Sequence, residues 1–236
     1  LGNKHASGEE IIKECGEEHL NSGWPIVYTS ADSVLQIAAH EQGFGLDRLY
    51  KICKIAAEIF NDLRVQRIIA RPFLGENKEN FFRTKNRKDF ISPPPTDTLC
   101  DKVIKSGKKC FGIGKIADIF GHRGISESIS GMSDVKLFDE MQKLIRKANP
   151  GDLIFANFVE FDTLYGHRRD LSGYARALEN FDRQLPKLFS NLDRDDFLVI
   201  TADHGNDPSF AGSDHTRERV PVLIKNQNLI NKCNGL

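Results

Sequence analysis

The sequence is poor in the residues that cross-link secreted domains. Its 236 residues include five cysteines, and no two of them are closely spaced. An odd, scattered set without short paired spacings argues against both a disulfide framework and a zinc knuckle. We therefore expect reduced, buried thiols at all five positions, which are Cys15, Cys53, Cys100, Cys110 and Cys233.

The chain also lacks an excess of charge of either sign, because 33 Lys and Arg balance 33 Asp and Glu. Without a net field there is no electrostatic reason to expect nucleic acid or a membrane surface as a partner. No apolar stretch approaches the roughly 20 residues of a membrane span, and the start has no signal-peptide layout. We predict a soluble, cytoplasmic protein. Because the chain begins with Leu1 rather than Met, we also expect a fragment of a longer protein.

Glycine-rich nucleotide-binding fingerprints are missing as well. Residues 110–113 predict a strand that ends in a glycine-bearing turn with Lys115, but the glycine spacing fits neither a Walker nor a dinucleotide motif. Lys115 is nevertheless a candidate cationic contact for a ligand.

The strongest domain boundary is the run Ser92-Pro93-Pro94-Pro95, because consecutive prolines cannot continue a helix or a central strand. We place a domain change there, giving residues 1–95 and 96–236. In the second part helices alternate with strands, which argues for a parallel sheet flanked by helices. The helices are predicted at 98–106, 133–148 and 172–192, and the strands at 110–113, 152–159 and 197–200.

The first part begins with a predicted helix. Ser7, followed three residues later by Glu10, indicates a capped start, and Gly23 ends the helix. A strand is predicted at 25–29, and a second helix carrying Val34, Leu35, Ile37 and Ala38.

Ser30 and Asp32 then lie at a strand-to-helix junction, where the ordinary role of such residues is capping. Residues 45–61 have the clearest amphipathic helix pattern in the chain. A strand at 65–70 follows and ends at Arg71-Pro72-Phe73.

The stretch after Arg71 is polar and basic, with Arg83, Lys85, Arg87 and Lys88 close together. A charge run is usually a solvated loop. However, a strand that ends in Arg beside such a loop also suits a phosphate, because guanidinium groups match its oxygens in pairs.

Two apolar strands are each followed by acidic and imidazole side chains. The strand at 197–200 leads to Asp203 and His204, with His215 eleven positions later, and the strand at 152–159 leads to Asp162 and His167. We interpret both as buried parallel strands, whose carboxyl ends share one edge of a sheet.

Any one of these residues alone is more often structural than a metal ligand. The repeated pattern favours a metal site, and five ligands exceed what one tetrahedral zinc takes, so two metals are expected. Carboxylate and imidazole without thiolate favour Mn²⁺, Mg²⁺, Fe²⁺ or Zn²⁺.

Taken together, several segments resemble bacterial phosphopentomutase, a family of the alkaline phosphatase superfamily of binuclear-metal enzymes. The metal motifs alone indicate the superfamily, whereas the first half resembles the cap domain of the mutase. The resemblance runs through residues 27–33, 69–73, 83–87, 114–116, 161–169, 201–208 and 214–218.

This resemblance implies an α/β fold in which an alkaline-phosphatase-like core, with a parallel sheet between helices, carries an α/β cap. Residues 1–95 would be the cap and 96–236 an incomplete metal-binding core. The implied ligands of one Mn²⁺ are Asp162, His167 and His215, and those of the second are Asp203 and His204. The residues implied to hold the sugar phosphate are Ser30, Asp32, Arg71, Arg87 and Lys115.

The implied reaction interconverts ribose 1-phosphate and ribose 5-phosphate, and the deoxyribose forms, through a phosphothreonine enzyme and a bisphosphorylated sugar activator. In the family, an earlier core strand supplies one more metal-binding Asp, and the phosphorylated Thr also precedes the cap. Neither motif occurs here. We therefore expect this chain alone to be inactive, to hold one cation weakly, and to need the missing segment of the same protein.

Two alternatives stay open. A related metal phosphatase or a cofactor-independent phosphoglycerate mutase would share Asp203 and His204, but should not need Arg71, Arg87 and Lys115. A non-catalytic module that binds metal or sugar phosphate is the other alternative, because no residue here matches the nucleophile.

Overall fold

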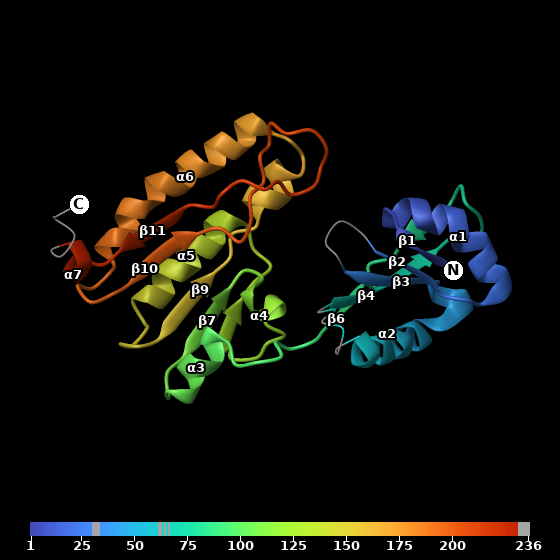
Figure 1. The fold of residues 1–236 in the computed structure, drawn as a ribbon, viewed down its shortest axis with the longest axis horizontal. Helices are drawn as coiled ribbons and strands as arrows, with labels where there is room; N and C mark the ends of the chain where they lie inside the picture. Colours follow the sequence, from blue (N-terminus) through green and yellow to red (C-terminus); the bar gives the residue numbers. More distant parts are fainter. Residues whose placement is uncertain (30–33, 61–62, 64, 66, 231–236) are drawn as a thin grey trace. The chain divides into compact units, whose positions relative to one another are not determined.

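The computed structural model describes residues 1–29, 34–60, 63, 65 and 67–230. The chain forms two compact units (Figure 1), one of residues 1–96 with 118–122 and the other of residues 97–117 with 123–236. Both units mix helices with parallel and antiparallel strands, so the α/β prediction is correct at this level.

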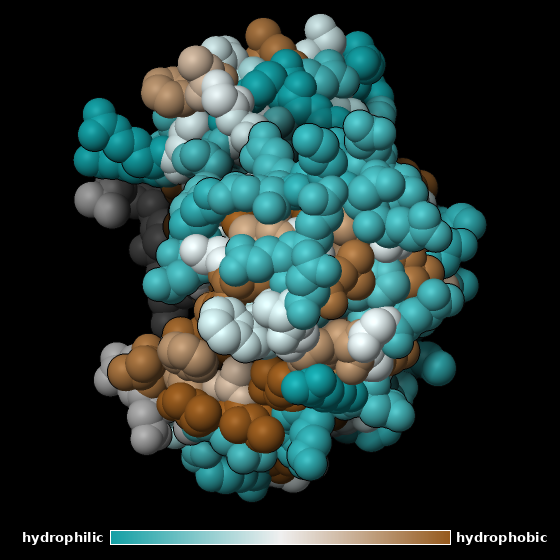
Figure 2. Space-filling view, turned by 90° about the vertical axis from the view of Figure 1, so that its right-hand side faces the viewer, coloured by the Kyte–Doolittle hydropathy of each residue, from teal (hydrophilic) through white to brown (hydrophobic). Residues whose placement is uncertain are grey.

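The face of the molecule seen in Figure 2 is mostly hydrophilic, and hydrophobic side chains gather near its lower edge. Within the residues that the structure describes, no helix combines the length and the apolar character that crossing a membrane requires.

The cysteines follow the expectation from the sequence as far as they are described. Four of them are buried and free: Cys15, Cys53, Cys100 and Cys110. Cys233 lies outside the described residues.

The first unit is built on one mixed sheet. Its strands run in the order β1-β2-β3-β4-β5, and β6 also pairs with β4. The pairs β1/β2 and β3/β4 are parallel, and the other pairs are antiparallel. The elements are β1 (Gly2–His5), α1 (Gly8–Ser22), β2 (Ile26–Thr29), β3 (Leu35–His40), the π-helical turn η1 (Glu41–Gly45), α2 (Leu46–Phe60), β4 (Arg67–Leu74), β5 (Phe82–Arg83) and β6 (Lys88–Ile91).

Helix α1 begins and ends where the sequence predicts. The hydroxyl of Ser7 accepts the backbone N–H of Glu10 at 3.3 Å. At the other end, Gly23 adopts a left-handed conformation (φ 68°) and its N–H bonds to the carbonyl of His19. Such a C-terminal residue is usually glycine because a side chain would be strained there.

The helix predicted from Val34 is wrong, because residues Leu35–His40 form strand β3. Successive side chains of this strand point to opposite faces of the sheet, and both faces are covered. Ala38 packs in the cluster with α1, whereas Ile37 and Ala39 pack in the cluster with α2. A strand buried on both faces is a continuous apolar run, which periodicity alone does not separate from a short helix.

Strand β4 continues to Leu74 rather than ending at Arg71. Pro72, which lacks a backbone N–H, falls between the residues that pair with β6 (Arg67 to Ala70) and those that pair with β5 (Phe73 and Leu74). The break between the two partner strands is where a sheet tolerates proline.

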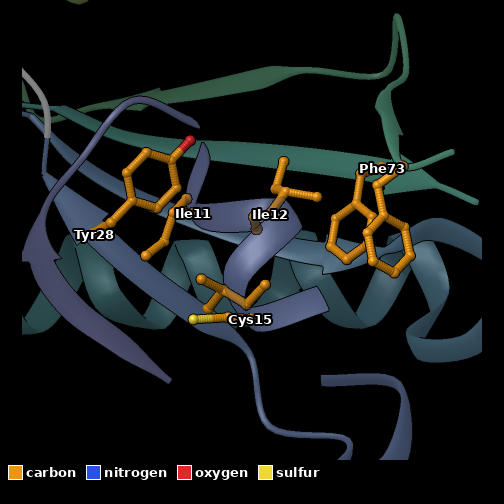
Figure 3. Packing of buried hydrophobic residues seen from close by; sticks show 8 residues of the cluster. Ile11, Ile12, Cys15, Tyr28 and Phe73 are labelled. Carbon is orange, nitrogen blue, oxygen red and sulfur yellow. The ribbon is translucent and has the colours of Figure 1, made fainter. Parts of the chain in front are cut away.

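The core of the first unit lies on both sides of this sheet. On one side Ile11 and Ile12 of α1 pack with Tyr28 and Phe73 of the sheet (Figure 3). On the other side the predicted apolar stripe of α2, with Leu49 and Cys53 fully buried, covers the strands.

The second unit contains a three-stranded parallel sheet in the order β8-β7-β9. Side chains of α5 and α6 pack with those of the sheet in one hydrophobic cluster. The parallel sheet flanked by helices is therefore confirmed here. The elements are α3 (Leu99–Lys105), β7 (Cys110–Ile113), α4 (Ile116–Ile119), β8 (Glu127–Ile129), α5 (Asp134–Ile145), β9 (Leu153–Ala156), the π-helical turn η2 (Phe161–Gly166), α6 (Leu171–Ser190), β10 (Leu198–Thr201), β11 (Val222–Lys225) and α7 (Gln227–Ile230).

The strand at 197–200 is present as β10, but it is neither parallel nor buried. It pairs antiparallel with β11 in a separate two-stranded sheet. Val199 is 45% exposed and Val222 is 64% exposed. An apolar run predicts a strand, but it holds no information on the direction of the neighbouring strand.

His19 links α1 to the sheet as a neutral side chain. Its Nδ1 lies 2.7 Å from the carbonyl oxygen of Trp24, and its Nε2 accepts the backbone N–H of His40 at 2.8 Å. An acceptor cannot carry a proton, and burial lowers the pKa of His19.

We expect the free energy of unfolding to fall as the pH drops below about 6.5, because the unfolded chain then binds a proton that the folded His19 resists. His19→Gln, which offers a neutral donor and acceptor, should flatten this dependence. Urea unfolding at pH 7.5, 6.5 and 5.5 measures it, with His5→Gln on exposed β1 as the control. An unchanged slope in His19→Gln would contradict the assignment.

Candidate metal centre and cationic cluster

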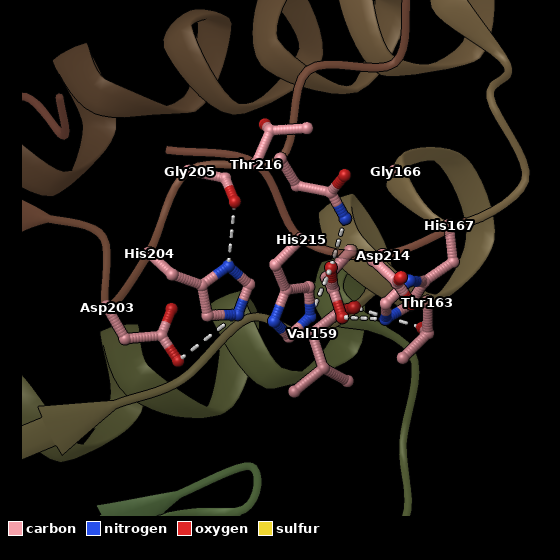
Figure 4. Close-up of polar contacts among 12 residues, drawn as sticks. Val159, Thr163, Gly166, His167, Asp203, His204, Gly205, Asp214, His215 and Thr216 are labelled. Atoms are coloured by element: carbon pink, nitrogen blue, oxygen red, sulfur yellow. Dashed lines mark hydrogen bonds and ion pairs between the residues drawn. The ribbon is translucent and has the colours of Figure 1, made fainter. Parts of the chain in front are cut away.

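The five predicted metal ligands lie near one another in the second unit, where Figure 4 shows His167, His215, His204 and Asp203, and Asp162 contacts two of these. Asp162 lies in η2 and His167 directly follows it. Asp203 and His204 follow β10, and His215 lies in the loop before β11.

Three of these residues form a compact group around Asp162. Its Oδ2 lies 3.1 Å from His167 Nε2, and its Oδ1 lies 3.4 Å from His215 Nε2. One ligand atom from each residue can be chosen so that all lie within 4.8 Å of one another, a spacing that one cation can bridge.

The other two residues adjoin this group through His215. The rings of His204 and His215 stack with their centroids 3.6 Å apart. His204 Nε2 lies 3.7 Å from Asp203 Oδ2, and the Asp203 side chain is 73% exposed. Asp203 is thus the least enclosed of the five.

Hydrogen bonds set the tautomers of two imidazoles in the form that a metal ligand needs. Nδ1 of His167 lies 2.5 Å from the carbonyl oxygen of Ser213, and Nδ1 of His204 lies 3.1 Å from that of Gly205. A carbonyl oxygen only accepts, so each Nδ1 carries a proton and Nε2 is the ring nitrogen that a cation can bind. Each Nε2 lies beside an Asp carboxylate, so a cation bound between them would have one imidazole and one carboxylate ligand.

One guanidinium group, that of Arg169, joins the two loops that supply the ligands. It donates to a carbonyl in its own loop and to four oxygen atoms of the loop between β10 and β11. The acceptors are the carbonyl oxygens of Gly166 (3.0 Å), Asp207 (3.1 Å), Gly212 (2.5 Å) and Asp214 (2.6 Å), and Asn206 Oδ1 (2.6 Å).

Asn206 carries this connection to Asp162. It is buried, its Oδ1 accepts from Arg169, and its Nδ2 donates to Asp162 Oδ1 at 2.6 Å. A Cβ on Gly166 would lie 2.5 Å from Asn206 Nδ2, so the close approach depends on glycine at that position. The sequence analysis missed Arg169 and Asn206 as site residues, although both lie inside the motifs that carried the resemblance.

The residues predicted to hold the sugar phosphate are spread over both units. Arg71 of β4 donates its Nε–H to Gln36 Oε1 at 2.8 Å. Arg87 makes a paired contact with Asp89, at 2.7 Å for each bond. Lys115 lies exposed in the turn after β7, in the second unit. Ser30 and Asp32 lie outside the described residues.

A further cation, Arg83, belongs to the same region of the first unit. A Cβ on Gly8 would lie 2.0 Å from Arg83 Nη2 and 2.5 Å from the Tyr28 hydroxyl, so the guanidinium group lies against both residues. Its buried Nε has no hydrogen-bond partner among the described residues. In the sequence, the basic character of this stretch and the resemblance through residues 83–87 pointed to it, but Arg83 was not among the predicted site residues.

Positive charge therefore accumulates around Tyr28. The pKa of the Tyr28 hydroxyl is raised by burial, and the charges of Arg83, Arg71 and Arg87 oppose that rise. Burial and the charge of Arg87 lower the pKa of Arg71. A half-buried group of guanidinium ions is stabilised by an anion, because an anion offsets their mutual repulsion.

We expect Arg169→Ala to weaken Mn²⁺ binding by about 10-fold or more, a usual loss when a group that orients metal ligands is removed. Titration of the protein with Mn²⁺, followed by electron paramagnetic resonance of the free ion, measures the dissociation constant. The neighbouring exposed Arg168→Ala is the matched control. Equal affinities for the two variants would refute the role given to Arg169.

The comparisons with known proteins agree with this geometry. Proteins called phosphopentomutase match the chain with 56% identity over 223 residues (Chelativorans sp.), 54% over 224 (Legionella pneumophila strain Philadelphia 1) and 50% over 236 (Sinorhizobium fredii). These matches cover 94%, 95% and 100% of this chain but 54%, 55% and 58% of the relatives. The chain thus spans little more than half the length of the relatives.

A solved structure of the PH0037 protein from Pyrococcus horikoshii aligns with 75% of this chain and 52% of its own, at 17% identity and a TM-score of 0.47. That likeness carries no further argument. Residues 108–234, more than half of the chain, match the metalloenzyme superfamily. The chain belongs to the metalloenzyme superfamily.

Proposed function

We propose that this chain is part of a phosphopentomutase, an isomerase that moves a phosphoryl group between the C1 and C5 hydroxyls of ribose or deoxyribose. The observation that carries the proposal is the convergence of Asp162, His167 and His215, with Asp203 and His204 beside them. The identity of 50 to 56% to proteins called phosphopentomutase also supports the proposal.

The donor set suits two divalent cations, which we propose to be Mn²⁺. Asp162, His167 and His215 would hold one, and Asp203 with His204 would supply part of the shell of the other. Bound there, such cations supply charge that neutralises a phosphoryl group and lowers the pKa of a hydroxyl. The position of Nε2 in His167 and His204 supports this, because each lies beside an Asp carboxylate that would share a cation with it.

The cationic cluster of the first unit would bind the phosphate that stays attached to the sugar. Arg71 donates to Gln36 and Arg87 donates to Asp89, and the buried Nε of Arg83 lacks a partner among the described residues. We propose that Ser30, Asp32 and Lys115 complete the pentose phosphate site. Residues 1–95 would then act as the cap, and 96–236 as part of an alkaline-phosphatase-like core.

The threonine that would carry the phosphoryl group matches no residue of this sequence. We therefore propose that it comes from another part of the same protein, and that a bisphosphorylated sugar maintains the phosphorylated form. A related metal phosphatase or phosphoglycerate mutase would share Asp203 and His204, but should not need Arg71, Arg87 and Lys115.

The full-length protein should convert ribose 1-phosphate to ribose 5-phosphate with Mn²⁺, and chelation by EDTA should abolish the reaction. Asp162→Asn should reduce turnover to background. Arg87→Ala should raise the KM about 10- to 100-fold, because a hydrogen bond to a charged group contributes roughly 1.5–3 kcal/mol. A coupled assay of ribose 5-phosphate formation measures all three.

Two results would contradict the proposal. Turnover of a phosphoglycerate but not of a pentose phosphate would favour the related mutase. Binding of ribose 5-phosphate by the full-length protein without turnover, at any Mn²⁺ concentration, would favour a binding module.

A further inference from the structure

Asp134, the first residue of α5, reaches across to the segment that precedes the metal ligands. Its Oδ1 accepts the backbone N–H of Val159 at 3.1 Å, and its Oδ2 accepts that of Glu160 at 2.9 Å. These two residues stand directly before η2, which contains Asp162. A single carboxylate thus binds two successive peptide groups at the entrance of the metal-binding turn.

This contact bonds the N-cap residue of η2, Glu160, and the residue before it. The N–H groups at the start of a helical turn have no partners within the turn. Within the described part of the chain, η2 has no capping bond from the side chain of its own N-cap residue, Glu160. The carboxylate from α5 instead holds the backbone that leads into the turn. The carbonyl of Val159 is also engaged, because it accepts both the N–H and the hydroxyl of Thr163 at 2.9 Å.

The same segment is held from its other side by the turn that carries Lys115. Asn157 donates its N–H to the carbonyl of Ile113 at 3.0 Å. Gly114 has a positive φ of 73°, and a Cβ there would lie 2.1 Å from the carbonyl oxygen of Asn157. Residues 157–160 are therefore bonded both to this turn and to Asp134.

Keeping a carboxylate at this position costs free energy. Burial, with a smaller contribution from the charge of Glu160, raises the pKa of Asp134 to about 6, while the two N–H groups oppose that rise. Buried polar groups in proteins are hydrogen-bonded, so the Asp134 side chain is held in the orientation that makes these two bonds.

We propose that Asp134 is a positioning residue of the metal centre, which fixes the start of η2 so that Asp162 and His167 face His215. Asp134 acts indirectly, through its bonds to the backbone N–H groups of Val159 and Glu160. The inference rests on the proposed metal-binding function and adds a residue that neither the sequence motifs nor the ligand geometry had indicated.

The test compares Asp134→Asn with Asp139→Asn in the full-length protein. Both residues lie on α5, but Asp139 is exposed and its carboxylate only approaches Lys187 Nζ, at 3.8 Å. Two quantities are measured: the Mn²⁺ dissociation constant, and the hydrogen-deuterium exchange of residues 157–167 in the metal-free protein. We expect Asp134→Asn to weaken Mn²⁺ binding about 10- to 100-fold and to speed exchange in that segment. Asp139→Asn should change neither.

Each outcome decides something. Faster exchange with unchanged Mn²⁺ affinity would make Asp134 a purely structural residue and overturn the inference. Unchanged exchange would overturn it as well, because the contact would then not hold η2. If the wild-type protein itself bound no Mn²⁺, the proposed function and this inference would fail together. Asp134→Asn keeps the shape of the side chain and one acceptor, so the variant remains folded enough for both measurements.

Discussion

The contact between Arg169 and the loop that joins β10 to β11 is the interaction on which the candidate metal centre depends. The ligands come from two segments, 162–167 and 203–215, that are far apart in the sequence. Neither segment is a regular helix or strand that could hold its ligands by itself. A planar, permanently charged group with several donors can bond many carbonyl oxygens at once. It therefore brings the two loops into one fixed arrangement, and Asn206 transmits that arrangement to Asp162.

The charge balance of the whole chain conceals a separation into two kinds of site. The first unit gathers guanidinium ions around Tyr28, whereas the second gathers carboxylate and imidazole groups around His215. The first arrangement suits an anion and the second suits cations. A phosphorylated sugar handled by a metal-dependent transfer needs both. The two halves of the proposed function are thus carried by complementary electrostatics, and the net charge of zero says nothing about either.

The elements recovered from the sequence are those with strong local signals. The Ser7 cap, the left-handed Gly23 and the amphipathic α2 depend on neighbours within a few residues, and the structure contains all three. The wrong predictions concern elements whose form depends on the strands and helices that pack against them. Residues from Val34 form a strand because both faces are covered, and β10 is antiparallel because β11 is its neighbour. Pro72 stays inside strand β4 because it lies where the antiparallel partner of β4 changes from β6 to β5.

For the site, the sequence by itself determined which residue types could bind metal and phosphate, because Asp-His pairs after apolar strands and clustered Arg residues are visible in one dimension. Only the tertiary structure decided that Asp162, His167 and His215 form one group with His204 stacked on it and Asp203 beside His204, that His167 and His204 leave Nε2 for a cation, and that Arg169, Asn206 and Asp134 hold these segments. The physical reason is that the decisive contacts join distant parts of the chain, such as Asp134 with Val159, 25 positions apart, and His167 with Ser213, 46 positions apart. Their geometry depends on carbonyl and peptide groups, whose positions no residue type specifies.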